Sequence, residues 1–271
     1  MYPSRTRAAA IARDTLDVLA AGRFANRAGA TVLLRDQLEA AVRGTVSYPP
    51  DEHLPRFATG DRPTVYEVVN DTTLEACRSL VAAGLNPVAL NFASARHPGG
   101  GFLNGARAQE ESLCRASGLY PCINGNAMYR YHATLSGGWY SNYAIYSPGV
   151  PVIKDDAGDM LDEPYSCAFV TAPAVNAGVI RDRDRGPIAD EMRERIEKVL
   201  AIMAGHGHDA AVLGAWGCGV FKNDPEVVAQ LFAKSLSGRF HGAFARVVFA
   251  VLDSSDDRHF IGPFEKRFGA G

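Results

Sequence analysis

The chain has 271 residues, 47% of them hydrophobic and 21% charged, and its 28 Lys and Arg against 30 Asp and Glu give a formal net charge of −2. This composition is that of a folded globular protein and excludes a disordered or fibrous chain. The near-neutral charge argues against direct binding of duplex nucleic acid, which requires many contacts of Lys and Arg to phosphate.

The N-terminal sixty residues have a helical pattern that then breaks. Ser4 is a candidate N-cap for a helix with Ile11, Leu16 and Leu19 on one side. A second helical pattern covers residues 33–42, and Tyr48-Pro49-Pro50 then interrupts the chain. We therefore expect a helical N-terminal extension over residues 1–62, packed on a single globular core over residues 63–271.

From residue 64 onward, short apolar runs alternate with helical patterns. The predicted strands lie within residues 65–69, 87–93, 144–153, 168–172, 211–214 and 246–252. Predicted helices begin at Asp71 or Thr72, where Glu75 completes a capping box with Thr72, after Pro187, and at Asp224-Pro225. This alternation indicates an α/β fold in which a mixed sheet is sandwiched between helices. Two charge-rich segments, 154–163 and 181–185, are predicted to be solvated loops.

The cysteines and the apolar segments of the sequence indicate the cellular compartment of the protein. The five cysteines are odd in number, widely spaced and without a C-x-x-C pair, so neither a disulfide framework nor a zinc knuckle is indicated, and we expect them to be small buried residues. Residues 131–153 form the longest stretch without charge, but their Ser, Gly, Asn and Pro exclude a membrane span. No apolar run near residue 1 is long enough for a signal peptide. A cytoplasmic protein without membrane contact is expected.

A glycine triplet follows the predicted buried strand 87–93. Asn91 lies near the end of that strand, Gly99, Gly100 and Gly101 follow, and seven residues later come Gln109, Glu110 and Glu111 at the start of a helical pattern. Open α/β sheets bind ligands at the carboxyl ends of their strands. Glycine is required where the backbone has positive φ or lies against a ligand. The segment therefore predicts a ligand site that contains two carboxylates.

A second glycine loop has the same layout. The apolar run 211–214 leads to Gly217, Cys218, Gly219, Val220 and Phe221, and a helix then begins at Asp224. Such a strand–loop–helix arrangement points backbone amides toward an anion. Neither the Lys-Ser/Thr of a triphosphatase loop nor the dinucleotide fingerprint spacing is present. A diphosphate held by neutral amides, with Phe221 packed on a sugar or base, fits this loop better.

These motifs together resemble the bacterial-type poly(ADP-ribose) glycohydrolases, whose core is a macrodomain. GGG, seven residues and QEE look like the signature of that family, and NDTTLEA, LNFASA, TAPAVN and GAWGCGVFKNDP follow its order over residues 64–252. The resemblance implies a macrodomain-like core, poly(ADP-ribose) or ADP-ribose as ligand, ADP-ribosylated proteins as targets, and no metal or cofactor. One departure is Ser94, where related proteins often have Asn, so a contact to the distal ribose is expected to be weaker or made elsewhere.

The resemblance also implies a role for each site residue. Glu111 is similar to the catalytic acid/base, and Glu110 and Asn91 match positions that hold or orient ribose hydroxyls. Three further sets are expected to contact substrate. These are Gly99, Gly100 and Gly101 near the ribose and diphosphate; Gly217, Cys218, Gly219, Val220 and Phe221 as the diphosphate loop; and Gln109 and Asn176.

Helix geometry favours catalysis by one carboxylate. Neighbouring side chains on a helix point about 100° apart, so Glu110 and Glu111 cannot easily flank one bond. Glu111 is expected to protonate the departing 2′-oxygen, the substrate's diphosphate to stabilise the ribosyl cation, and the ionised Glu111 then to activate water. The predicted activity is exo-acting release of ADP-ribose. A non-catalytic ADP-ribose reader and a mono-ADP-ribosyl hydrolase remain alternatives.

Several other residues have two interpretations. Most of the aromatic residues in 129–146 are expected to pack in the core or at the rim, although one of them could stack on adenine. Phe260 and Phe264 either cover an adenine pocket or fix the C-terminal segment. His206 and His208 are predicted to be a loop pair rather than metal ligands.

Overall fold

The computed structural model describes residues 3–61 and 63–269 of the chain. The helices are α1 (Arg5–Ala21), α2 (Arg35–Arg43), α3 (Thr73–Ala82), α4 (Gln109–Ala116), α5 (Leu119–Ile123), α6 (Ala127–Ala133), α7 (Ile188–Gly205), α8 (Pro225–Ser237) and α9 (Gly262–Phe268). The strands are β1 (Arg23–Ala25), β2 (Thr31–Leu33), β3 (Val46–Tyr48), β4 (Val65–Val69), β5 (Pro87–Phe92), β6 (Ala144–Lys154), β7 (Met160–Ala172), β8 (Ala210–Leu213) and β9 (Arg246–Ala250).

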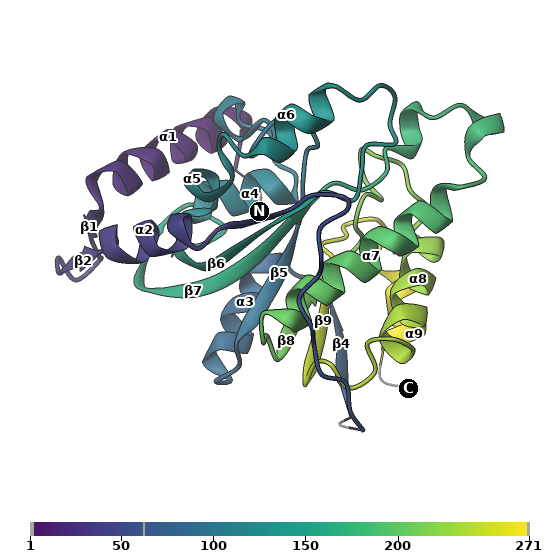
Figure 1. Cartoon of the computed structure of the whole chain (residues 1–271). Coiled ribbons are helices and arrows are strands. Elements are labelled where there is room, and N and C mark those ends of the chain that lie inside the picture. The colour runs from purple at the N-terminus through teal and green to yellow at the C-terminus, as the bar shows by residue number, and fades with distance from the viewer. Residues whose placement is uncertain (1–2, 62, 270–271) are drawn as a thin grey trace.

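Within the described residues, seven strands form one mixed sheet in the order β3-β6-β7-β5-β8-β9-β4 (Figure 1). Strand β5 is parallel to both β7 and β8, β9 is parallel to β8 and β4, and β6 is antiparallel to β3 and β7. Strands β1 and β2 pair separately as a short ribbon. The predicted α/β class with a mixed sheet is confirmed.

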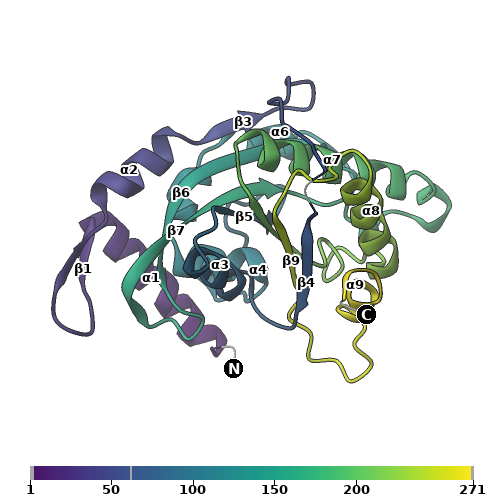
Figure 2. The ribbon, with the colours of Figure 1, turned by 90° about the horizontal axis from the view of Figure 1, so that it is seen from below.

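Helices cover both faces of this sheet. Helices α7, α8 and α9 lie on one face, and α3 and α4 lie on the other (Figure 2). The side chains of β5 alternate accordingly: Val88 and Leu90 belong to the core under α7 and α8, whereas Ala89 belongs to the core under α3 and α4. All three are 0% exposed. A strand buried on both faces reads as a continuous apolar run, which is why its sequence was recognisable.

The predicted helix starts are confirmed by their caps. The hydroxyl of Ser4 accepts a hydrogen bond from the amide of Arg7, that of Thr72 from the amide of Glu75 at 3.2 Å, and the Asp224 carboxylate from the amide of Glu226 at 2.9 Å. Each cap satisfies an amide that the first helical turn leaves unpaired.

The N-terminal region differs in one respect from the expected helical extension. The segment before residue 62 also contributes β3 to the edge of the main sheet, so it is not purely helical. The predicted boundary between residues 62 and 63 falls at a residue outside the described part of the chain.

The charge-rich segment 154–163 is only partly a loop: residues 155–159 form the turn of a hairpin, and the prediction is wrong at the two ends, which belong to strands. Lys154 ends β6, residues from Met160 onward belong to β7, and only a tight turn separates the strands. The ammonium of Lys154 is buried and pairs with Asp14 of α1, which removes the cost of burying that charge alone. The other charged segment, 181–185, forms an exposed 3₁₀ turn around Asp182–Asp184.

The five cysteines are all buried and free of disulfides, as predicted. None of the helices in the described ranges is both long and apolar enough to cross a bilayer.

Candidate active site

The two glycine loops meet at the carboxyl ends of the central parallel strands of the sheet. They follow β5 and β8, which are parallel neighbours, so both loops leave from the same ends of their strands. A cavity of about 320 Å³ lies between them. Its lining comprises Phe92, Ala93, Ser94, Ala108, Gln109, Glu110, Glu111, Ala174, Ala215, Trp216, Gly217, Gly219, Val220 and Phe221. Segments more than a hundred residues apart in the chain thus form one site.

Gln109 joins the first turn of α4 to the end of β5. Its Oε1 accepts a hydrogen bond from the Phe92 amide at 2.9 Å, and its Nε2 donates to the Leu90 carbonyl at 2.7 Å and to the Thr73 hydroxyl at 3.1 Å. Strand β8 pairs with β5 only as far as residue 89, so the Gln109 amide takes the place of a strand partner beyond that point. The structure therefore places Gln109 as a positioning residue, with its amide bonded to protein.

Glu110 is held on both carboxyl oxygens. The Ser94 amide donates to Oε2 at 2.7 Å, and Nδ2 of Asn91 lies 3.4 Å from Oε1. Glu110 is 3% exposed, and this burial raises its pKa to about 8, with the nearby Glu111 adding to the increase and the Ser94 hydrogen bond opposing it. At neutral pH the Glu110 carboxyl is therefore largely protonated.

Glu111 differs in having one uncommitted oxygen. Its Oε1 accepts a hydrogen bond from the Gly101 amide at 2.9 Å. Its Oε2 is buried and has no hydrogen-bond partner among the described residues. A buried acceptor without a partner is costly and is found where a ligand or water completes the site. The Glu111 Oε2 atom is thus an uncommitted acceptor in the lining of the cavity.

The glycine triplet is required by the packing of these carboxylates. Gly99 and Gly100 have φ of +72° and +58°, a region that L side chains rarely adopt. A Cβ on Gly100 would overlap Oε1 of Glu111 and lie 3.2 Å from Oε2 of Glu110. The loop backbone therefore lies directly against both acids.

The second loop is packed at its start and open at its middle. Gly217 has φ +74°, and a Cβ there would lie 2.5 Å from the Cβ of Ala174. Nδ2 of Asn223 donates to the carbonyls of Val175 and Gly217, which fixes the loop. At Gly219 an added Cβ would meet no described atom within 4 Å. This loop therefore leaves room for a ligand against its backbone.

Six predicted site residues do not line this cavity: Asn91, Gly99, Gly100, Gly101, Asn176 and Cys218. The Cys218 side chain turns into the core, is 4% exposed, and burial raises its pKa to about 12. The backbone amide of Asn176 donates to the Gly138 carbonyl at 2.8 Å, and the side-chain Oδ1 of Asn176 is buried without a described partner. Sequence reasoning could not detect this because side-chain direction in an irregular loop follows no periodicity.

The Ser94 departure is accommodated within its own loop. Its hydroxyl accepts a hydrogen bond from the His97 amide at 3.2 Å, while its own amide holds Glu110. Its contribution to the acid pair therefore comes from the backbone and does not depend on an Asn side chain.

An adjoining cavity of about 220 Å³ extends the site and shares Phe92, Gln109, Ala215 and Gly219 with the first. Its remaining wall includes the apolar side chains of Leu74 and Phe260 and the carboxylate of Asp71. Phe264, in contrast, is 0% exposed and packs on Phe249 with ring centroids 5.1 Å apart. Phe260 is therefore a cavity residue and Phe264 a core residue. The place of Asp71 at this cavity could not be predicted from the sequence, because it depends on the order of strands in the sheet.

The clustered aromatics pack mainly in the core. Tyr129, Tyr143 and Tyr146 are 5 to 6% exposed. Tyr146 stacks on His206, and its hydroxyl bonds His208 at 2.8 Å, so this histidine pair is structural. No group of three or more His, Cys, Asp or Glu suited to a metal occurs in the described ranges.

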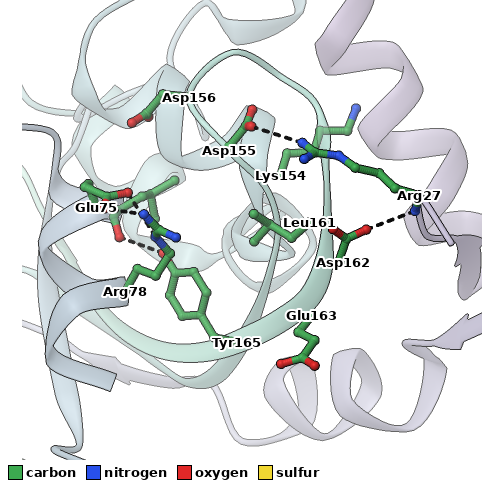
Figure 3. Close-up of a pocket in the computed structure, with 11 residues that line it drawn as sticks. Arg27, Glu75, Arg78, Lys154, Asp155, Asp156, Leu161, Asp162, Glu163 and Tyr165 are labelled. Atoms are coloured by element: carbon green, nitrogen blue, oxygen red, sulfur yellow. Dashed lines mark hydrogen bonds and ion pairs between the residues drawn. The ribbon is translucent and has the colours of Figure 1, made fainter. Parts of the chain in front are cut away.

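A larger hollow of about 510 Å³ beside the β6–β7 hairpin is a different kind of feature (Figure 3). Its charges pair within the protein: Arg27 lies 3.7 Å from Asp155, and Nε of Arg78 donates to Glu75 at 3.0 Å. These ion pairs engage four of the charged side chains that surround the hollow. The smaller cavity, with its uncommitted buried carboxylate oxygen, is the better candidate for chemistry.

Comparison with known proteins gives one consistent result. A family model described as "Microbial-type PARG, catalytic domain" matches residues 12–155. The structure is similar to that of poly(ADP-ribose) glycohydrolase (PARG) from Thermomonospora curvata, with 46% identity, a TM-score of 0.92, and coverage of 97% of this chain and 100% of that chain. The same organism's enzyme bound to the inhibitor ADP-HPD gives 45% identity, a TM-score of 0.90 and the same coverage, 97% and 100%. PARG from Deinococcus radiodurans in complex with ADP-ribose gives 41% identity and a TM-score of 0.80, over 85% of this chain and 96% of that one. No curated protein matches the chain.

Proposed function

This chain belongs to the family of microbial-type PARG catalytic domains, and we propose that it hydrolyses the ribose–ribose O-glycosidic bond of poly(ADP-ribose) and releases ADP-ribose from the chain end. The fold is then a macrodomain-like core, and residues 63–271 are its catalytic unit. The observation that carries this proposal is the buried, unpartnered Oε2 of Glu111 in a cavity between two glycine loops. A site that only bound ADP-ribose would gain nothing from an uncommitted acid beside a diphosphate.

On this proposal the two joined cavities hold one ADP-ribose unit. We place the diphosphate against the open backbone around Gly219 and the distal ribose beside Glu111. The adenosine then occupies the adjoining cavity, where Phe260 packs on the base and the Asp71 carboxylate accepts a hydrogen bond from the exocyclic amine. The support is the continuity of the cavities through Phe92, Gln109, Ala215 and Gly219.

Glu111 performs both proton transfers. It donates its proton to the 2′-oxygen of the preceding unit as the bond from C1 of the distal ribose breaks. The resulting oxocarbenium-like ribose is stabilised by the substrate's own diphosphate. The Glu111 carboxylate then removes a proton from the attacking water, which restores the acid.

Glu110 cannot share this role because the Ser94 amide and Asn91 hold both of its oxygens. In its protonated form at neutral pH it donates a hydrogen bond to a ribose hydroxyl. It also adds no negative charge beside Glu111 and the diphosphate. One glutamate orients the sugar and the other moves the proton.

Natural substrates on this proposal are ADP-ribosylated proteins. Five free buried cysteines fit a reducing compartment such as the cytoplasm.

The test compares the wild-type chain with Glu111→Gln on labelled poly(ADP-ribose), with release of ADP-ribose measured by chromatography. General acid–base catalysis predicts a loss of roughly 10²–10⁴-fold in rate, with ADP-ribose affinity retained. The matched control is Glu163→Gln, an exposed carboxylate at the charged hollow, which should leave the rate unchanged.

Near-wild-type release by Glu111→Gln would contradict the assignment of the acid. Binding of ADP-ribose without release by the wild type would identify a reader. Release only from mono-modified protein would identify a mono-ADP-ribosyl hydrolase.

A further inference from the structure

Beyond Phe221, the wall of the catalytic cavity continues as an aromatic and basic shelf. The ring of Tyr140 lies 6.1 Å from that of Phe221, centroid to centroid. The guanidinium carbon of Arg96 lies 5.8 Å from the centroid of the Tyr140 ring. Arg96 follows Ser94, a cavity residue, by two positions, and Lys222 follows Phe221 directly. We call Arg96, Tyr140 and Lys222 the outer shelf.

The backbone of Tyr140 is held in a strained conformation. Its φ is +52°, which is unusual for a bulky side chain. Its neighbours are anchored from below: the buried His132 bonds the Ser141 hydroxyl at 2.7 Å, and the buried Arg195 donates to the Trp139 carbonyl. Strain of this kind persists where the surroundings over-determine it, and it concentrates at binding sites. The fold therefore fixes the Tyr140 ring beside the cavity mouth.

The basic groups of the outer shelf are available to an anion. Arg96 and Lys222 are exposed, and across the described ranges neither forms an ion pair with a carboxylate. One Arg96 nitrogen donates to the Leu135 carbonyl at 2.7 Å, which orients the guanidinium and leaves its other donors outward.

The opposite end of the site has the opposite charge. The adjoining cavity is bordered by the carboxylates of Asp71 and Asp156. Poly(ADP-ribose) has two negative charges per unit, so it is repelled from the end at Asp71 and attracted to the outer shelf.

We propose that the outer shelf is a subsite for the penultimate ADP-ribose unit of the polymer, which is the leaving group of the reaction. This inference rests on the proposed function. With the adenosine of the terminal unit at Phe260 and its distal ribose at Glu111, the polymer continues past Phe221. There a base or ribose packs on Tyr140, and the diphosphate of the penultimate unit pairs with Arg96 and Lys222. The subsite lowers KM for polymer by holding the leaving unit.

The experiment compares two substrates. One is poly(ADP-ribose), and the other is ADP-ribose with a nitrophenyl leaving group on C1 of the distal ribose, which has no penultimate unit. Tyr140→Asn removes the ring but tolerates positive φ, and Arg96→Ala and Lys222→Asn remove surface charges without touching the core. Each variant is expected to raise KM for polymer by about 5- to 100-fold for the ring and a few-fold per charge, with kcat little changed.

For the nitrophenyl substrate, the same variants should change kcat/KM by less than about two-fold, since base stacking and phosphate contacts to the missing unit are absent. The matched control is Arg130→Ala: this exposed arginine also donates to a backbone carbonyl, that of Gly125 at 3.1 Å, but lies on α6 away from the cavity lining. Arg130→Ala should leave the kinetic constants for both substrates unchanged. A second readout is salt: the rise of polymer KM with NaCl should flatten in Arg96→Ala.

Wild-type kinetics on polymer, or equal losses on both substrates, would overturn the outer shelf as a subsite while leaving the glycohydrolase function in place. Failure of the wild-type chain to cleave polymer would instead overturn both proposals.

Discussion

The two glycine loops at the ends of β5 and β8 look alike in sequence but use glycine for different purposes. At Gly100 the absent side chain makes room for two buried carboxylates, whereas at Gly219 it leaves open space toward the cavity. The first loop is therefore part of the acid's own packing, and the second exposes backbone to a ligand. Substitutions should affect chemistry through the first loop and affinity through the second.

Among substitutions in the two glycine loops, the largest effect is expected from Gly100→Ala. The new Cβ would overlap the Glu111 carboxylate at a position with φ +58°, so the acid must move. A displacement of about 1 Å from productive geometry costs roughly 100-fold in kcat. Release of ADP-ribose from polymer measures this, with ADP-ribose affinity as the control for folding. Activity within about three-fold of wild type would show that the loop does not position the acid.

The corresponding change in the second loop, Gly217→Ala, should act on binding. Its φ of +74° and the 2.5 Å approach to Ala174 predict a shift of the loop and a loss of about 1–3 kcal/mol in the free energy of unfolding. We expect KM for polymer to rise by about ten-fold because amide contacts to the diphosphate are misplaced, with kcat falling less. Titration calorimetry with ADP-ribose, together with thermal unfolding, measures both effects. A loss confined to kcat would remove the distinction between the loops.

A smaller effect that depends on pH is expected from Glu110→Gln. Because the Glu110 pKa is about 8, ionisation above that pH adds a charge beside the diphosphate, and KM should rise from pH 8 upward in the wild type. The Gln variant should have activity within about ten-fold of wild type at pH 7 and no rise in KM. An alkaline limb that persists in the variant would assign it to another group.

The raised pKa of Glu110 also makes the free energy of unfolding depend on pH. The folded chain keeps the Glu110 proton between pH 4.5, the ordinary pKa of a glutamate, and about pH 8, whereas the unfolded chain loses it at the lower pH. The free energy of unfolding should therefore fall as pH rises through this window, and Glu110→Gln should remove that contribution. Denaturant titrations at pH 5 and pH 8 measure the difference.

The smallest effect is expected from Gly219→Ala. The added methyl group meets no described atom within 4 Å, so stability should be unchanged within about 0.5 kcal/mol. Any effect should appear only as a rise of a few-fold in KM, since the methyl group lies where the ligand approaches. A large loss of stability would mean that the second loop is packed as tightly as the first.

Local chemistry could be predicted well from the sequence. Helices begin at Ser4, Thr72 and Asp224 because a side chain accepts a nearby amide hydrogen bond, which needs only residues two or three apart. The strand 87–92 was recognisable because it is buried on both faces. The family resemblance rested on the same short motifs, and the family is confirmed.

Other features required the fold. The sequence alone predicts a solvated loop from Lys154 onward because the partner that lets Lys154 be buried at the end of β6, Asp14, lies 140 residues away. The hydrogen bonds of Gln109 to the end of β5 cannot be predicted from the sequence, because those backbone groups lack a strand partner only once β8 diverges from β5.

The residues alone determined which groups are available: two adjacent glutamates, two glycine loops, and caps that start the helices after them. Only tertiary structure decided that Glu111 keeps a bare oxygen while Glu110 is fully bonded and neutral, and that Cys218 turns inward. The reason is that a helix cap depends on hydrogen bonds between residues two or three apart in the chain, which the sequence shows directly. The burial of a carboxyl group, and with it the pKa of that group, depends on which segments the order of strands in the sheet places beside it.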